Sequence, residues 1–380
     1  MFKAKWMYSL VLIVSLLVLS VSPASAASFP PGHTPPLGDE EPPQIDDFTP
    51  MPTDISSLGQ ISVDAVANPS PIAPYQQFVY SRTPKFFFSP KTNATQYHIS
   101  VVDIVAEPDK VVYNYYGTGG CTNICKLQPG IALKTYRYQA IAGGVYLWYV
   151  EAMVGGVWQG FTTSAPFAVL STGFSSTFDT STDKWQYLSG TWALNGTGAW
   201  KAVGPSTTTI TALQKEIFTN DYVYEVRMKR KTEVGSLNRI IFMGTPDPLA
   251  ANKTWDTGYY FGYDNNGTWS FWRRDGGLNT TLLYDSVPSP YVVPYGWNTL
   301  TVWTDYPNFY LWINGAYLGM VQDATYRGGL VGVGMYEIDA AASSFLVDSA
   351  RLYYSATGPY ELTGAQLGAP LNRVVTGEIE

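Results

Sequence analysis

Seven residues in the second half of the chain have side chains suited to binding a sugar. They are three tryptophans, two tyrosines and two arginines: Tyr260, Trp272, Arg274, Trp303, Tyr310, Trp312 and Arg227. The flat apolar face of a pyranose packs on an aromatic ring, and the donor fork of an arginine grips vicinal hydroxyls or an acidic sugar. Brought together on one surface, these residues would form a glycan-binding site.

The elements that must position these rings are β-strands. In Phe309-Tyr310-Leu311-Trp312-Ile313, the first, third and fifth residues supply the inner face of a strand, and the two aromatics between them point outward. The segment Leu300-Thr301-Val302-Trp303 repeats the pattern with Trp303 outward. Two interpretations stay open: the outward rings form a ligand surface, or loops or a neighbouring domain bury them.

Acid–base and metal chemistry have few candidate residues. The two histidines are His33, in a Pro-rich segment, and His98, which is expected on the surface of a strand, so neither a nucleophile–His–acid triad nor a zinc site is predicted. The run Glu337-Ile338-Asp339-Ala340-Ala341-Ala342 resembles the acidic motif of laminarinase-type β-glucanases, but alanine replaces the second acid. Because glycoside hydrolysis uses two carboxyl groups, we predict no catalytic residue.

The N-terminus has the features of a secretion signal over residues 1–26. Lys3 and Lys5 precede the apolar run Leu10–Val21, and Ala24-Ser25-Ala26 is a small-residue cleavage site. Loss of these two lysines changes the formal net charge from −7 to −9. Nucleic acids and anionic membranes require a basic patch, so neither is a predicted partner. We predict a secreted or extracellular cell-surface protein with no transmembrane segment in the mature chain.

Two cysteines, Cys121 and Cys125, are present in the whole chain. In an oxidising compartment, a pair that closes a short loop favours a disulfide over a metal site, which would need more ligands.

Residues 27–71, rich in Pro, Asp and Glu, are predicted to be a disordered linker.

From residue 72 to 170, short apolar runs alternate with turn residues, as in an all-β sandwich. The predicted strands are Phe86–Phe88, Tyr97–Val102, Lys110–Tyr116, Ala132–Gln139, Tyr146–Ala152 and Phe167–Val169. The run Gly144-Val145-Tyr146-Leu147-Trp148-Tyr149-Val150 and the closing Phe167-Ala168-Val169 resemble the fibronectin type III-like modules of secreted microbial proteins. The resemblance implies an immunoglobulin-like sandwich that serves spacing and attachment.

Residues 172–355 form a second predicted module. Its motifs, in order, are Trp297-Asn298-Thr299-Leu300-Thr301-Val302, Ile313-Asn314-Gly315, the Gly-rich segment 328–333 and Phe345-Leu346-Val347-Asp348. This order resembles the concanavalin A-like, laminin-G-like jelly rolls of lectins and glucanases. The resemblance implies a sandwich of two curved sheets. Residues 356–380 show no pattern and are predicted to be a tail.

The jelly-roll resemblance also implies a metal position. The first and last strands of a jelly roll are neighbours, which would bring Asp179 close to Asp348, and similar sandwiches often hold a stabilising Ca²⁺ there. Alternatively, Asp179 is a turn or cap residue and Asp348 a surface residue of a strand. Both interpretations stay open.

We therefore predict an all-β protein in which a fibronectin III-like sandwich precedes a concanavalin A-like jelly roll that binds a glycan or polysaccharide without cleaving it. Two alternatives remain. One is a structural subunit of a surface layer, appendage or extracellular matrix, whose aromatics contact other copies or other cell-surface proteins. The other is a glycoside hydrolase or polysaccharide lyase.

Overall fold

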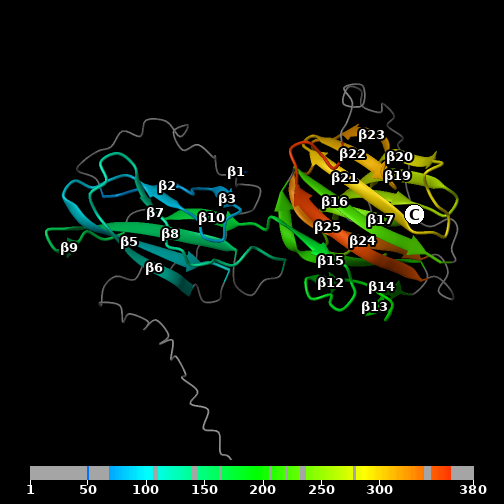
Figure 1. Ribbon diagram of the computed structural model, residues 1–380, viewed down its shortest axis with the longest axis horizontal. Coiled ribbons are helices and arrows are strands. Elements are labelled where there is room, and N and C mark those ends of the chain that lie inside the picture. The colour runs from blue at the N-terminus through cyan, green and yellow to red at the C-terminus, as the bar shows by residue number, and fades with distance from the viewer. Residues whose placement is uncertain are drawn as a thin grey trace, which may run out of the picture. The chain divides into compact units, whose positions relative to one another are not determined.

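The computed structural model describes most of the chain beyond residue 67. The described residues are 68–105, 110–138, 144–161, 164–204, 207–219, 221–231, 237–276, 280–337 and 344–360, together with the backbone of Thr49–Pro50. Within them every regular element is a β-strand, and the strands pair into four sheets (Figure 1). The prediction of an all-β protein is confirmed. This described part of the chain also contains no helix of the length and apolar character needed to cross a membrane.

The first sandwich contains the strands that precede residue 170. They are β1 (Thr49–Pro50), β2 (Pro71–Ala73), β3 (Gln77–Val79), β4 (Phe86–Phe88), β5 (Ala94–Asp103), β6 (Lys110–Thr118), β7 (Cys125–Leu127), β8 (Val145–Val154), β9 (Val157–Trp158) and β10 (Ala165–Val169). One sheet has the order β2-β4-β7 and the other β1-β3-β10-β8-β5-β6, with β9 paired to β8. Phe86, Ile99, Trp148 and Phe167 are buried in the core of this sandwich. Its membership of the fibronectin type III family remains a prediction.

Cys121 and Cys125 form a disulfide, as predicted. Cys125 is the first residue of β7, an edge strand of the three-stranded sheet. The bridge therefore fixes the preceding loop to that edge.

Part of the first half of the chain differs from the prediction. The strand predicted at 132–139 is not formed at 132–138. Instead, the amide of Leu133 donates to the carbonyl of Arg82 at 2.7 Å, and the amide of Lys134 donates to the hydroxyl of Tyr146 at 2.8 Å. Scattered partners, including an isolated bridge between Arg137 and Glu216, thus satisfy this backbone in place of one continuous strand pairing.

The predicted linker also contains a strand. Thr49–Pro50 pairs in parallel with Gln77–Phe78 of β3. The predicted leader and the rest of the predicted linker up to residue 67 lie outside the described residues.

The second sandwich contains the strands that follow residue 172. They are β11 (Gly173–Ser176), β12 (Trp185–Tyr187), β13 (Thr191–Leu194), β14 (Trp200–Val203), β15 (Thr208–Thr219), β16 (Tyr222–Arg230), β17 (Asn238–Thr245), β18 (Thr257–Tyr263), β19 (Thr268–Asp275), β20 (Thr280–Pro288), β21 (Asn298–Asp305), β22 (Asn308–Ile313), β23 (Ala316–Gln322), β24 (Gly328–Glu337) and β25 (Phe345–Tyr354). The β16 sheet has the order β13-β14-β25-β16-β21-β22-β23, with β11 paired to β25. The β17 sheet has the order β12-β15-β24-β17-β18-β19-β20.

Inner faces of these two sheets enclose one large apolar core. Phe309, Leu311 and Ile313 of β22, together with Leu300 and Val302 of β21, all belong to it. The alternation predicted for both strands is therefore confirmed. This parity directs the side chains between them to the outer face of the β16 sheet.

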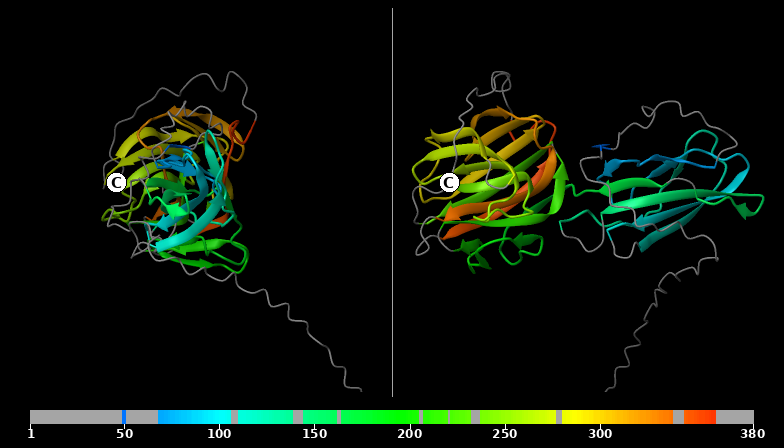
Figure 2. Two further views of the ribbon diagram at one scale, coloured as in Figure 1. Left: turned by 90° about the vertical axis from the view of Figure 1, so that its left-hand side faces the viewer. Right: turned by 180° about the vertical axis from the view of Figure 1, so that it is seen from behind.

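The first and last strands of this sandwich lie side by side, as a jelly roll requires. Residues 173–176 of β11 pair antiparallel with residues 350–353 of β25. In Figures 1 and 2 the last strand, coloured orange to red, lies beside green strands from the start of the sandwich. The predicted jelly-roll architecture is confirmed.

Candidate functional site

The seven predicted glycan-binding residues lie on two different sheets. Tyr260, Trp272 and Arg274 are in β18 and β19 of the β17 sheet, whereas Trp303, Tyr310, Trp312 and Arg227 are in the β16 sheet. All five aromatic residues lie outside the core shared by the sheets, in two separate apolar clusters. Because the outer faces of two packed sheets point in opposite directions, the seven residues cannot converge on one ligand. The predicted single site needs this correction.

The rings on the outer face of the β16 sheet are covered. Trp303 and Tyr310 stack with 4.7 Å between ring centroids, and Trp312 is only 1% exposed. The segment 355–360 lies over them: the Nε1 group of Trp303 donates to the carbonyl of Ser355 at 3.1 Å, and the ring of Tyr360 lies 5.6 Å from that of Trp312. These rings form a packed cluster and not the open platform that the ligand-surface interpretation requires.

Arg227 and Asp348, predicted for different roles, bind each other. Their side chains form an ion pair with 2.9 Å between Nη1 and Oδ2. Asp179 is exposed, and its Oδ1 lies 2.8 Å from the position that a Cβ on Gly198 would occupy. Among the described residues, no three His, Cys, Asp or Glu side chains are grouped so as to hold a metal ion. The calcium site remains a prediction.

His98 is buried and not at the strand surface as predicted. Its Nδ1 lies 2.8 Å from Oε1 of Glu151 and its Nε2 lies 2.8 Å from Oδ1 of Asn114. The ring of Tyr116 stacks on the imidazole at 4.2 Å. Alternation along β5 gives the outward position of His98, but the aromatic cover comes from other strands.

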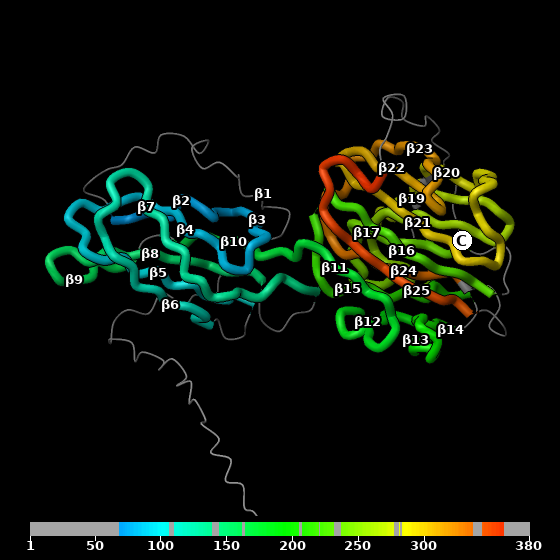
Figure 3. Tube along the Cα trace, viewed as in Figure 1, coloured from blue at the N-terminus to red at the C-terminus, as the bar shows by residue number. Residues whose placement is uncertain are grey.

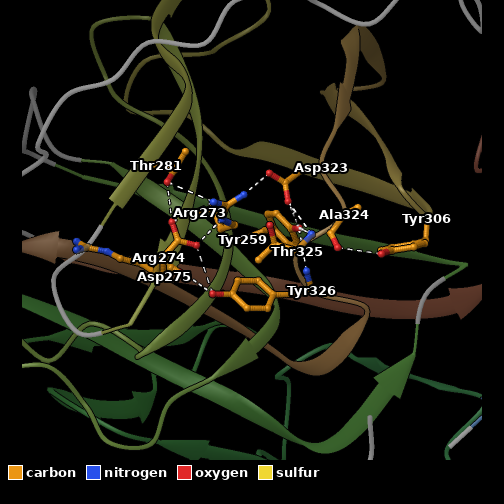
Figure 4. A network of polar contacts seen from close by, with 10 residues as sticks. All are labelled: Tyr259, Arg273, Arg274, Asp275, Thr281, Tyr306, Asp323, Ala324, Thr325 and Tyr326. Atoms are coloured by element: carbon orange, nitrogen blue, oxygen red, sulfur yellow. Dashed lines mark hydrogen bonds and ion pairs between the residues drawn. The ribbon is translucent and has the colours of Figure 1, made fainter. Parts of the chain in front are cut away.

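A network of charged and hydroxyl groups in the second sandwich joins β18, β19 and the segment after β23 (Figure 4). Arg273 forms ion pairs with Asp275 and Asp323, and the hydroxyl of Tyr259 donates to Asp323 at 2.6 Å. Burial raises the pKa of Asp275, but hydrogen bonds from Arg273 and Thr281 outweigh burial and hold that pKa below its ordinary value. A glycosidase acid must keep its proton near neutral pH, so the lowered pKa makes Asp275 unsuited to that role.

A cleft that the sequence analysis did not predict lies between β12 and the β13–β14 hairpin. It has a volume of about 450 Å³ and is here named the tryptophan cleft. Its lining residues are Thr182, Trp185, Gln186, Tyr187, Trp192, Ala193, Leu194, Trp200 and Lys215. The three strands lie together at one end of the second sandwich (Figure 3).

Three indoles build the wall of the tryptophan cleft. The ring centroid of Trp200 lies 4.3 Å from that of Trp192 and 5.7 Å from that of Trp185. The Nε1 group of Trp185 donates to Ser176 Oγ at 3.0 Å, and that of Trp192 to the carbonyl of Ser189 at 2.9 Å. With these two N–H groups satisfied inside the protein, Trp185 and Trp192 need no polar partner from a ligand.

The rim of the tryptophan cleft is accessible and partly polar. Tyr187 is 63% exposed and Leu194 38% exposed. Gln186 and Lys215 also line the cleft and add hydrogen-bonding groups beside the rings. The signal in the sequence was the density of tryptophans, three within residues 185–200. The strands that carry these tryptophans are short and separated by turns, so the sequence pattern did not predict that the three rings lie together.

Comparisons with known proteins gave structural likeness alone. No protein-family model and no curated protein matches the chain. The chain is similar to a carbohydrate-binding module, CBM66, from Bacillus subtilis, at 16% identity over 44% of this chain and 94% of that chain, with a TM-score of 0.35. It is similar to a Bacillus licheniformis β-glucanase, at 11% identity over 49% of this chain and 99% of that chain, with a TM-score of 0.38. It is also similar to a β-1,3-glucanase from Mycobacterium marinum, at 12% identity over 47% of this chain and 97% of that chain, with a TM-score of 0.36. Identities and TM-scores this low leave the function to be inferred from the geometry of the site.

Proposed function

We propose that the protein is a carbohydrate-binding, lectin-like protein that binds a glycan in the tryptophan cleft. The observation that carries the proposal is a cleft whose accessible rim holds the phenol ring of Tyr187 beside the amide of Gln186 and the ammonium group of Lys215, above a wall of three indoles that are 3–9% exposed. Sugars need both kinds of contact, because their C–H faces pack on rings while their hydroxyls require hydrogen bonds. A volume of about 450 Å³ lies in the usual range of small-ligand sites.

The chemistry of the tryptophan cleft supports binding without cleavage. Glycoside hydrolysis needs two carboxyl groups on either side of the scissile bond. The described residues that line the cleft include no Asp or Glu. Residues 338–343, which contain most of the glucanase-like acidic run, lie outside the described residues. The glycosidase alternative thus draws no support from this site.

A role outside the cell is part of the same proposal. It rests on the predicted leader and on the low content of charged residues, 14% of the chain. A secreted protein of this kind would meet polysaccharides and glycoproteins directly.

The test is a binding measurement on the purified full-length chain. A panel of neutral polysaccharides (β-glucan, xylan, mannan and cellulose) would be screened, and the tightest binder titrated by calorimetry against the wild type and Tyr187→Ala. A stacked ring contributes about 0.5–1.5 kcal/mol, so we expect affinity to fall about two- to tenfold. The melting temperature should stay unchanged because Tyr187 is 63% exposed.

Tyr291→Ala is the matched control, since Tyr291 is 48% exposed and does not line the cleft. Equal losses in Tyr187→Ala and Tyr291→Ala, or no binding to any polysaccharide, would contradict the proposal. Release of reducing ends during the screen would show an enzyme.

A further inference from the structure

Another hollow, here named the basic pocket, has a volume of about 560 Å³. Its lining residues are Tyr80, Arg82, Lys134, Thr135, Arg137, Leu170, Ser171, Thr172, Lys184 and Glu216. Four of these side chains are cations and one is a carboxylate, although acidic residues outnumber basic ones in the whole chain, 30 to 23. A concentration of positive charge in an acidic protein indicates a ligand of negative charge.

Residues of both sandwiches form the walls of the basic pocket, and the two sandwiches belong to one compact unit of the chain. The hydroxyl of Tyr80 lies 2.7 Å from Oγ1 of Thr219. The amide of Tyr138 donates to the carbonyl of Lys215 at 2.7 Å. Hydrogen bonds that join the sandwiches therefore hold the residues that line the pocket.

Glu216 is the one acid among the described residues that line the basic pocket, and it is already paired. Its side chain is buried, and its Oε1 lies 3.3 Å from Nη2 of Arg137. This carboxylate offsets one guanidinium, so the charges of Arg82, Lys134 and Lys184 are left over. Within the described part of the chain, none of these three side chains forms an ion pair.

The three remaining cations are accessible to a ligand. Arg82, Lys134 and Lys184 are all exposed. The Nε group of Arg82 donates to the carbonyl of Leu133 at 2.7 Å, which fixes the side chain at the pocket. The two lysines take part in the fold through hydrogen bonds of their backbone groups. Their ammonium groups are therefore available for an anion.

The basic pocket lies beside the tryptophan cleft. Lys184 lines the pocket and the next residue, Trp185, lines the cleft, whereas Lys215 lines the cleft and Glu216 the pocket. The amide of Lys215 donates to the carbonyl of Lys184 at 2.9 Å, at the end of the pairing between β12 and β15. Neighbouring strands are only about 4.8 Å apart, so a ligand of a few sugar residues is long enough to reach both hollows.

The lining of the basic pocket also suits the rest of a sugar. Thr135, Ser171 and Thr172 supply hydroxyl groups, and Tyr80 supplies an aromatic ring. A bare inorganic ion would use the cations alone, whereas an acidic sugar would use the cations, the hydroxyl groups and the ring.

We propose that the basic pocket and the tryptophan cleft form one extended site for an acidic polysaccharide. Arg82, Lys134 and Lys184 bind the carboxylate of a uronate residue, while a neighbouring sugar of the same ligand packs in the cleft. The inference rests on the proposed function, because it assumes a glycan in the tryptophan cleft, and it names the class of that glycan. A sulfate ester is the other source of the same oxyanion chemistry.

The charge of the ligand is the first variable of the experiment. Oligogalacturonate and its fully methyl-esterified form would be titrated by calorimetry against the full-length chain. Exposed ion pairs are individually weak, but three of them together make about a tenfold difference, so the wild type should bind the acidic form about tenfold more tightly than the ester. In about 1 M NaCl the Debye length is about 3 Å, and the preference should fall below about twofold. Equal affinity for both forms at low salt, or binding of neither, would overturn the proposal.

Paired substitutions at the two lysines test the basic pocket itself. Lys134→Gln/Lys184→Gln should reduce the preference for the acidic form to about threefold or less, and Lys134→Arg/Lys184→Arg, which keeps both charges, should retain it. Lys201→Gln is the matched control, because Lys201 is an exposed lysine of β14 that lines neither hollow. A preference that survives in the double glutamine variant, or that Lys201→Gln alone lowers equally, would contradict the pocket.

The melting temperature separates a ligand role from a structural one. Both lysine side chains are exposed and their backbone groups make the contacts with the fold, so Lys134→Gln/Lys184→Gln should melt at the same temperature as the wild type. A large fall would show that the two ammonium groups stabilise the fold, and the ligand role would then be rejected.

Further ligands identify the anion. Sodium acetate and sodium sulfate, at the same concentration as the oligosaccharide, should compete poorly with it. Competition as strong as that of the oligosaccharide itself would mean a site for small ions and would refute a glycan site. Tighter binding of a sulfated oligosaccharide than of oligogalacturonate would overturn the carboxylate assignment.

Tyr187→Ala distinguishes the two hollows. The variant should weaken binding of the acidic and the esterified form by the same factor, about two- to tenfold, and should keep the preference between them. Affinity that depends on Tyr187 but shows no preference for the acidic form would reject the basic pocket and leave the tryptophan cleft in place. A Tyr187→Ala protein that binds the acidic form as tightly as the wild type would contradict the tryptophan cleft and, with it, the shared ligand.

Discussion

Single residues show what strand alternation determines and what it leaves open. Trp303 and Trp312 do point away from the core of the sandwich, as the pattern predicted. Their exposure depends on Ser355 and Tyr360, which lie beyond the last strand and pack on them. Alternation is a property of the strand itself, whereas burial of an outer face depends on which distant segment covers it. Sequence reasoning therefore gave the direction of these rings correctly and left their accessibility open.

The burial of Trp312 leads to a stability prediction. Truncation of a buried tryptophan removes packing and leaves a cavity, so Trp312→Ala should lower the free energy of unfolding by about 3–5 kcal/mol. Chemical denaturation monitored by circular dichroism measures this change. Tyr187→Ala, at the exposed rim of the cleft, serves as the control and should change it by less than about 0.5 kcal/mol. A Trp312→Ala protein as stable as the wild type would restore the open-platform interpretation.

At the scale of elements, the long strands were the predictable part. The last motif of the predicted second module, Phe345-Leu346-Val347-Asp348, is the start of β25. The jelly-roll resemblance predicted that this last strand lies beside the first strand, β11. Short elements were missed, because β12, β13 and β14 are three or four residues long and carry too little periodicity to be recognised. Those same strands form the tryptophan cleft. The candidate site thus lies where sequence patterns are weakest.

Residues 356–360, predicted to be the start of a tail, pack on the second sandwich. Gly358 has a φ of +78°, and a Cβ there would lie 2.8 Å from the Trp303 ring. Gly196 has a nearly equal φ of +74° with nothing within 4 Å of its Cβ position. Both Gly→Ala changes impose the same backbone strain, about 1 kcal/mol, but only Gly358→Ala adds a clash.

We therefore expect Gly358→Ala to lower the melting temperature clearly more than Gly196→Ala does, in paired thermal scans of the full-length chain. The physical reason is that the ring of Trp303 is held by its own hydrogen bond to Ser355 and by its stack on Tyr310. Equal shifts in the two variants would mean that the segment does not pack on Trp303.

At the scale of the whole molecule, the ion pairs of Arg273 and Arg227 join strands of the second sandwich to one another. Arg273 joins β19 to Asp323, which follows β23, and Arg227 joins β16 to β25. The ion pairs of Arg273 are partly buried, so salt screens them less than it screens the more exposed pair of Arg227 and Asp348. Aromatic residues are 15% of the chain, and many of their rings are buried between the sheets or on the outer faces of the sheets.

The calcium prediction is tested at this scale. An ion that binds only the folded chain adds about 2.7 kcal/mol of stability at one hundred times its dissociation constant, so a real site would raise the melting temperature in CaCl₂ relative to EDTA. Asp348 is already paired with Arg227 at 2.9 Å, and a cation would have to displace that guanidinium. We therefore expect equal melting temperatures in 5 mM EDTA and in millimolar CaCl₂. A rise in CaCl₂ that Asp348→Asn abolishes, and that Asp247→Asn leaves intact, would establish the site instead. Asp348 would then exchange its arginine partner for the ion, and the Arg227 guanidinium would keep its contact with Trp297, whose ring centroid lies 5.0 Å from Cζ.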